Sequence, residues 1–122
     1  MPVSVECEVD RARRVPRRGH GDHGVARLVE RYVARHHGVA LSEMMAPGRA
    51  TARAKWARHT TMYLERVVLQ LTCEEIAARF GHHRTSVTHA CRKVEERRDE
   101  AAFDARLQAL EARVGRYLEA SR

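Results

Sequence analysis

Residues 80–95 read Phe80-Gly81-His82-His83-Arg84-Thr85-Ser86-Val87-Thr88-His89-Ala90-Cys91-Arg92-Lys93-Val94-Glu95. Within this segment, apolar residues recur at the spacing of one helix face, at Val87, Ala90, Cys91 and Val94, which predicts a helix over about 84–98. Gly81 can adopt a positive φ at little cost and is therefore expected to end a preceding helix. The segment predicts a tight turn that leads into a helix.

A second, shorter helix is predicted immediately upstream. Thr72 precedes Glu75 by three residues, which is the capping-box arrangement that satisfies backbone amides in the first turn of a helix. Ile76, Ala77 and Phe80 then supply a buried face for residues 72–80. The two helices and the glycine turn between them predict a helix-turn-helix.

The second helix of this motif carries polar side chains that its inner face cannot accommodate. If Val87, Ala90, Cys91 and Val94 face inward, several of the remaining residues must line the outer surface, namely Thr85, Ser86, Thr88, His89, Arg92 and Lys93. Hydroxyl groups and donors suit base edges, threonine methyls suit the thymine methyl, and cations suit phosphates. The pattern indicates a surface that reads the major groove of DNA.

Helical periodicity continues on both sides of the motif, and no strand pattern competes with it. We expect helices over about 25–36, 52–70 and 104–119, the last capped by Asp104, with a short helical turn after Ser42 that Pro47 ends. An apolar stripe from Trp56 to Leu71 marks the long helix. The prediction is an all-α bundle of about five or six helices.

The arginine-rich residues 1–24 contain few large apolar groups, so we expect a flexible arm there and one domain over residues 25–122. The arm could contact phosphates or a minor groove, or be a solvated tail or an overlong start-codon assignment. These interpretations stay open at the level of sequence.

Composition narrows the class of partner. The 23 Lys and Arg against 16 Asp and Glu give a net charge of +7 in 122 residues, and the pI is about 10.1. This charge favours a polyanion as the partner, but it does not distinguish DNA from RNA or from an anionic membrane. The three cysteines form no CxxC pair and the histidines have no metal-ligand spacing, so we expect neither a metal nor a cofactor. No apolar run approaches the roughly 20 residues of a membrane span, and we expect a cytoplasmic, nucleoid-associated protein.

Part of the motif resembles a known family. His89-Ala90-Cys91-Arg92-Lys93, followed by Val94-Glu95, resembles the signature of the C-terminal duplex-binding domain of the bacterial replication initiator DnaA, and Thr85-Ser86-Val87 is similar to its paired threonines and following valine. The resemblance covers most of residues 25–97. It implies a helix-turn-helix bundle like that domain, also similar to the Trp repressor, and recognition of a short asymmetric DnaA box in double-stranded DNA.

The resemblance also implies roles for individual residues. Base reading would fall to His83, Arg84, Thr85 and Ser86, minor-groove contact to Arg49, and phosphate contact to Arg58, His59, Cys73, Glu74, His89 and Lys93. Two departures from the family stand out. The turn is one residue shorter than the family's Gly-Gly-Arg-Asp-His and lacks its acid, and the carboxylate of Glu74 should repel a phosphate.

No GxxxxGK[ST] phosphate loop precedes the motif, so we expect no ATPase. Cys91 and His89 are two residues apart on a helix and point to different sides, so they form no nucleophile–base pair and we expect no enzyme activity. The leading hypothesis is a freestanding DNA reader that regulates transcription or replication initiation, with no membrane partner and no small-molecule substrate. The alternative is a helical adaptor that docks the apolar stripe of residues 104–118 on a partner such as the full-length initiator. RNA binding is a weaker third hypothesis.

Overall fold

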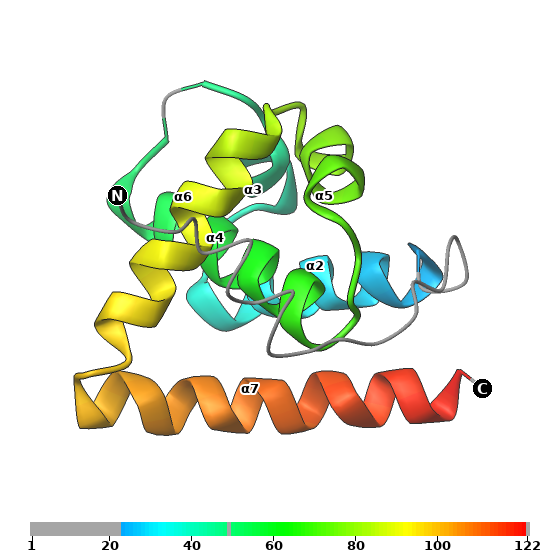
Figure 1. Ribbon diagram of the computed structural model, residues 1–122, viewed down its shortest axis with the longest axis vertical. Helices are drawn as coiled ribbons and strands as arrows, with labels where there is room; N and C mark the ends of the chain where they lie inside the picture. Colours follow the sequence, from blue (N-terminus) through cyan, green and yellow to red (C-terminus); the bar gives the residue numbers. More distant parts are fainter. Residues whose placement is uncertain (1–22, 49, 122) are drawn as a thin grey trace, which may run out of the picture.

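The computed structural model describes residues 23–48 and 50–121, and in this part of the chain it contains helices and no strand (Figure 1). The all-α prediction is thereby confirmed. The helices are α2 (His23–His37), α3 (Leu41–Met45), α4 (Ala52–Val67), α5 (Cys73–Phe80), α6 (Arg84–Arg97) and α7 (Ala101–Ala120). The arm predicted for residues 1–24 lies outside the described residues, except that His23 and Gly24 already belong to α2.

Helix α4 is the centre of the bundle and packs against α2, α3, α5 and α6. Every residue from Ala57 to Val67 is buried, so the helix is enclosed on all sides over this stretch. Its apolar residues Met62, Tyr63 and Leu64 join the core formed by the neighbouring helices. Because the enclosed part also includes charged residues, those side chains need partners inside the protein.

The two ends of α5 follow the local sequence. Thr72 Oγ1 accepts a hydrogen bond from the Glu75 amide at 3.1 Å, and the Thr72 amide donates to the Glu75 carboxylate at 2.8 Å, which confirms the capping box. Gly81 ends the helix with a φ of 67°. A side chain would be strained in that conformation, so the turn into α6 requires glycine.

Helix α4 ends at Val67, three residues earlier than the periodicity predicts. Gln70 has a φ of 64°, which no α-helix can contain. The turn is held by Arg66, whose Nη1 donates to the Leu71 carbonyl oxygen at 3.0 Å, and by the Leu71 amide, which donates to the Glu65 carbonyl oxygen at 3.1 Å. Leu71 is buried, as expected, but lies in the loop rather than on the helix.

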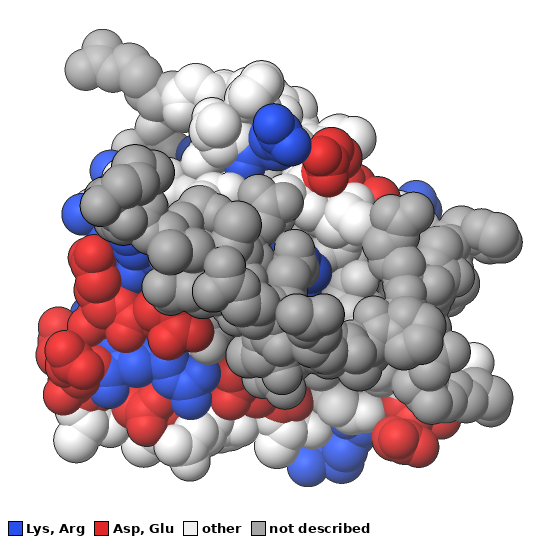
Figure 2. All heavy atoms as spheres, in the orientation of Figure 1, with Lys and Arg blue, Asp and Glu red and all other residues white. Residues whose placement is uncertain are grey.

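The predicted start of the last helix is wrong. Helix α7 begins at Ala101, and Asp104 does not cap it. Instead, the Asp104 carboxylate accepts a hydrogen bond from Arg98 Nε at 2.5 Å, while Arg98 Nη1 donates to Tyr63 Oη at 2.9 Å and to Glu111 at 3.0 Å. Arg98, at the end of α6, therefore joins α4 to α7. Figure 2 shows the acidic and basic groups gathered around this corner, at the lower left of the view.

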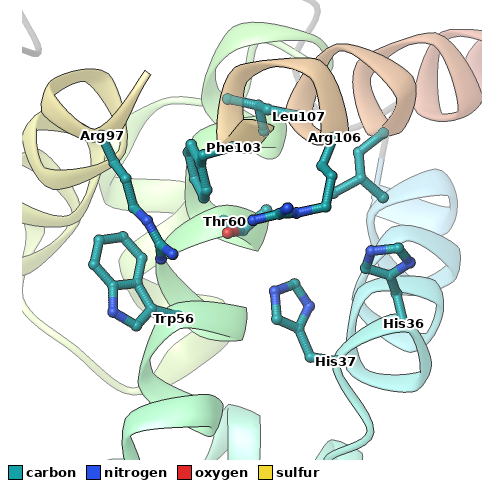
Figure 3. Close-up of a pocket in the computed structure, with 9 residues that line it drawn as sticks. His36, His37, Trp56, Thr60, Arg97, Phe103, Arg106 and Leu107 are labelled. Atoms are coloured by element: carbon teal, nitrogen blue, oxygen red, sulfur yellow. The ribbon is translucent and has the colours of Figure 1, made fainter. Parts of the chain in front are cut away.

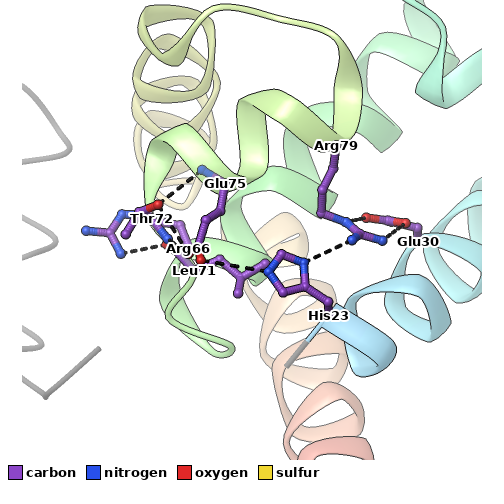
Figure 4. A network of polar contacts seen from close by, with 7 residues as sticks. All are labelled: His23, Glu30, Arg66, Leu71, Thr72, Glu75 and Arg79. Atoms are coloured by element: carbon purple, nitrogen blue, oxygen red, sulfur yellow. Dashed lines mark hydrogen bonds and ion pairs between the residues drawn. The ribbon is translucent and has the colours of Figure 1, made fainter. Parts of the chain in front are cut away.

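A second polar network joins α2 to α5. Arg79 donates through Nε and Nη2 to the two carboxylate oxygens of Glu30, at 2.6 and 2.9 Å, and its Nη1 contacts His23 Nδ1 at 3.2 Å (Figure 4). The Glu30 side chain is 5% exposed, so this is a buried, two-pronged ion pair. Burial, and then the neighbouring carboxylate of Glu30, raise the pKa of Glu65 on α4 well above its usual value.

The apolar side of α7 faces the core. Phe103, Leu107, Leu110 and Val114 are all buried, and Tyr117 packs against the same cluster. The adaptor hypothesis needs this side to be open to a partner. Since the fold already covers it, the stripe of residues 104–118 acts as core.

Candidate nucleic-acid interface

The candidate interface is the N-terminal half of α6, which α5 and α4 hold from behind. Val87, Ala90, Cys91 and Val94 are buried, as their spacing predicts. The opposite face carries the exposed residues Arg84, Thr85, His89, Arg92 and Lys93, with Ser86 and Thr88 half-buried beside them. Helix α7 follows the far end of α6 and lies away from its N-terminus (Figure 1). The surface is therefore polar, cationic and not covered by α7.

His83 caps α6, a role that residue spacing alone does not indicate. Its Nδ1 accepts a hydrogen bond from the Thr85 amide at 3.2 Å and lies 3.0 Å from Thr85 Oγ1. An acceptor nitrogen carries no proton, so a neutral His83 has its proton on Nε2 and the Thr85 hydroxyl donates to Nδ1. The cap thus leaves one donor nitrogen on the exposed ring of His83.

Arg84 and Glu74 form an ion pair between the two helices of the motif. Arg84 Nη1 lies 3.3 Å from a Glu74 carboxylate oxygen, and both side chains are more than half exposed, at 56% and 62%. Such a pair contributes little to stability because water screens it. The pair instead affects position, because it holds the guanidinium of Arg84 beside Glu74.

Three residues expected to contact phosphates have buried side chains. Arg58 is 6% exposed, and its Nε and Nη2 both donate, at 2.9 Å, to the carbonyl oxygens of Met44 and Ala46 at the end of α3. Cys73 is 1% exposed at the first position of α5. A contact from Cys73 to an anion would have to come from its backbone amide, at a helix N-terminus where such groups favour negative charge.

His59 is also buried, and it lines an open groove between α4 and the start of α6. The groove has a volume of about 330 Å³ and is bordered further by Arg58, His82, Thr85 and His89. Burial, and then the positive charges of Lys55 and other neighbouring groups, lower the pKa of His59 from 6.5 to about 4. His59 is therefore neutral at physiological pH and is a hydrogen-bonding group rather than a cation.

The sequence did not indicate His82 as a site residue. It lines the same groove, and its Nε2 is buried with no hydrogen-bond partner in the described part of the chain. Burial, and then the charge of Arg58, lower its pKa. Only its place next to His83 in the turn could have pointed to it. Arg49, the expected minor-groove residue, lies outside the described residues.

The sequence that forms this site matches a family of known proteins. The model of the bacterial DnaA protein helix-turn-helix matches residues 26–94, more than half of the chain. This chain belongs to that family. It is 38% identical over 69 residues to the chromosomal replication initiator protein DnaA of Mesorhizobium japonicum, 38% to that of Rhizobium johnstonii and 36% to that of Cereibacter sphaeroides.

The match to DnaA is confined to one part of each protein. The 69 residues are 56% of this chain and only 14–15% of the length of these relatives. The match to the family model runs from α2 through most of α6, so it includes the helix-turn-helix and ends before α7. The DnaA helix-turn-helix binds DNA and is not catalytic, so the family membership supports DNA binding for this chain.

Two further findings concern the described residues alone. None of their helices has the length and apolar character needed to cross a bilayer. No three of their histidine, cysteine and acidic side chains converge in a way that could ligate a metal ion.

We expect His59 to make the stability of this domain sensitive to acid. Between pH 6.5 and about 4 the unfolded chain binds a proton at His59 that the folded chain rejects, so the free energy of unfolding falls as the pH is lowered through this range. Melting temperatures of the wild type and His59→Gln, measured from pH 7.5 to 4, should converge or cross as the pH falls. Parallel curves would contradict the burial of a neutral imidazole.

Proposed function

We propose that this protein binds double-stranded DNA sequence-specifically at DnaA-box-like sites and regulates transcription or replication initiation without hydrolysing ATP. The observation that carries the proposal is the exposed polar end of α6 on a DnaA-type helix-turn-helix. A recognition helix presents its N-terminal residues to base edges in the major groove, and this is the part of α6 that is open.

The side chains divide into two groups by what they can reach. His83, Arg84, Thr85 and Ser86 stand at the tip of α6 and are proposed to read bases, with a donor on His83 Nε2 and a guanidinium suited to a guanine edge. The surrounding residues are proposed to contact phosphates, namely Arg58, His59, Cys73, Glu74, His89 and Lys93. Of these, Cys73 and Glu74 would act through their backbone amides. Arg49 is proposed for the minor groove.

A mobility shift tests the proposal directly. At physiological salt, a duplex with a DnaA-type box should bind at least tenfold more tightly than a scrambled duplex of equal length, since each base pair that is read discriminates by about 1–3 kcal/mol. If about five cations meet phosphates, log affinity should fall against log salt with a slope of roughly −4 to −5. Equal binding to both duplexes contradicts specific recognition, and preference for an RNA hairpin would favour the RNA hypothesis.

Replacement of Glu74 by Gln should change affinity and specificity in opposite directions. Loss of a carboxylate near the phosphates should strengthen binding to any duplex by about 1 kcal/mol, or roughly fivefold. The freed Arg84 should then distinguish box from scrambled duplex less well, because its guanidinium is no longer held in place. Titrations of both duplexes measure the two effects.

Glu96→Gln is the matched control for this experiment, since Glu96 is an exposed acid near the opposite end of α6. It removes the same charge without touching Arg84. If Glu96→Gln strengthens binding as much as Glu74→Gln, net charge alone explains the effect and the placement of Glu74 beside the DNA is wrong.

A further inference from the structure

A pocket separate from the candidate DNA interface lies where the end of α2 meets α4, the end of α6 and α7. Figure 3 shows side chains from all four helices directed into it. Its volume is about 220 Å³, below the roughly 300–1,000 Å³ of sites for drug-sized molecules. A ligand of this pocket must therefore be small.

One wall of the pocket carries a hydroxyl group without a partner. Thr60 is 2% exposed, and its Oγ1 is buried with no hydrogen bond. The neighbouring Thr61 is satisfied, because its hydroxyl donates to the Ala57 carbonyl oxygen at 2.8 Å. An unpaired buried hydroxyl costs about 1–3 kcal/mol, so a group that accepts its proton would be stabilised there. In Figure 3, Thr60 lies in the middle of the pocket residues.

Positive charge surrounds this hydroxyl. The guanidinium groups of Arg97 and Arg106 both project toward Thr60 in Figure 3. Arg106 has no ion-pair partner in the described part of the chain, and Arg97 has only Glu100, at 3.6 Å and largely exposed. Burial lowers the pKa of His37 in the same pocket; its hydrogen bond to the Val33 carbonyl oxygen opposes this shift, and the charges of neighbouring groups, Arg106 and Arg97 among them, add to it. Within the described part of the chain, the pocket therefore holds the charge of Arg106 without a carboxylate to balance it.

The remaining wall is apolar and aromatic. The Arg97 guanidinium lies 4.6 Å from the ring centres of both Trp56 and Phe103, whose rings contact each other edge to face with their centres 6.1 Å apart. Leu107 and Leu110 continue the apolar wall. These two cation–π contacts hold the guanidinium of Arg97 against the aromatic wall. A bare inorganic anion would leave these apolar groups unused.

We propose that this pocket binds a small organic anion with a flat apolar body, of the aromatic carboxylate class. The carboxylate accepts hydrogen bonds from Arg106 and Thr60, and the ring packs against Phe103 and Leu107. The pocket uses none of the residues proposed to read bases. Much of the pocket lies beyond the DnaA match, because five of its residues follow residue 94, namely Arg97, Phe103, Arg106, Leu107 and Leu110.

Trp56 provides a direct readout, because it is the one tryptophan of the chain and lines the pocket. Titration of the 122-residue protein with benzoate at constant ionic strength should give a saturable change in tryptophan fluorescence with a Kd of about 1 mM or tighter. Benzamide and inorganic phosphate should bind at least about fivefold more weakly. Absence of saturation up to concentrations on the order of 10 mM overturns the proposal, as does equal binding of benzamide or phosphate.

Variants of the two polar groups locate the site. Arg106→Gln should weaken benzoate binding roughly tenfold and Thr60→Val about threefold, through loss of a charged and a neutral hydrogen bond. Arg116→Gln, an exposed arginine on the same helix, is the matched control and should bind benzoate as the wild type does. If Arg116→Gln weakens binding as much as Arg106→Gln, benzoate responds to general charge and the pocket is not its site. The melting temperature of each variant, compared with that of the wild type, shows whether unfolding contributes to weaker binding.

Discussion

Replacing Arg84 and Thr85 together by alanine is expected to lower the affinity for a duplex with a DnaA-type box by at least about 30-fold, since the two lost base contacts are together worth about 2–6 kcal/mol. Affinity for scrambled duplex should fall far less, because only one cation is lost. Comparing the two duplexes in a mobility-shift assay therefore distinguishes the loss of base recognition from the loss of one positive charge. Both side chains are exposed, so the fold should tolerate the change.

Arg116→Ala is the control for the charge removed in this double variant. Arg116 is exposed on α7, which lies away from the N-terminus of α6 (Figure 1). It should leave box recognition unchanged. If the double variant binds the box as tightly as the wild type, while its melting temperature is also unchanged, the tip of α6 is not the reading surface and the proposed function fails.

Replacing Arg79 by methionine is expected to destabilise the domain by about 3–5 kcal/mol. The variant leaves the carboxylate of Glu30 buried without its partner, close to the buried carboxyl group of Glu65. For a domain of about 100 residues, this loss lowers the melting temperature by more than about 12 °C. Thermal unfolding followed by circular dichroism measures it.

The loss of stability in Arg79→Met should depend on pH in a defined direction. The charge of Arg79 lowers the pKa of Glu65, so its loss raises that pKa further. The buried carboxyl group of Glu65 then retains a proton that the unfolded chain releases near pH 4.5, and the stability of the variant falls as the pH rises above that value. The deficit should be larger at pH 8 than at pH 5. A deficit that is constant over this range would contradict the proximity of the two acids.

The double variant Glu30→Gln, Arg79→Met tests the same network from the other side. It removes both charges, so it should recover much of the stability that Arg79→Met loses. A double variant as unstable as the single one would show that the aliphatic part of Arg79, rather than its charge, matters. Arg116→Met, an exposed substitution, should change stability by less than about 0.5 kcal/mol.

The sequence predicted those features that neighbouring residues control. The capping box of Thr72 and Glu75 and the positive φ of Gly81 involve contacts within a few residues, so their types and spacing were sufficient to predict both ends of α5. The inner face of α6 followed from a helical repeat over a few turns, which is why the exposed tip with Arg84 and Thr85 could also be anticipated.

Two predicted helix boundaries were wrong, because side-chain hydrogen bonds that lie outside the helical repeat set them. Aspartate is a favoured helix cap, yet the Asp104 carboxylate accepts a hydrogen bond from Arg98 and the helix begins at Ala101. The periodicity of α4 runs on past Val67, yet the backbone of Gln70 and the hydrogen bond of Arg66 end the helix there. Propensity is a weak preference of less than about 1 kcal/mol per residue, and buried hydrogen bonds to charged groups exceed it.

Local order therefore came from the sequence alone: an all-α chain, a helix-turn-helix and the polar face of α6, because each rests on contacts between residues close along the chain. Tertiary packing decided the rest. It buried Arg58 and His59 around a central α4, paired Glu30 with Arg79 across 49 residues, and closed the pocket around Thr60. These outcomes depend on which helices meet, and whether a charged side chain is solvated or enclosed is settled only by the elements that pack on it.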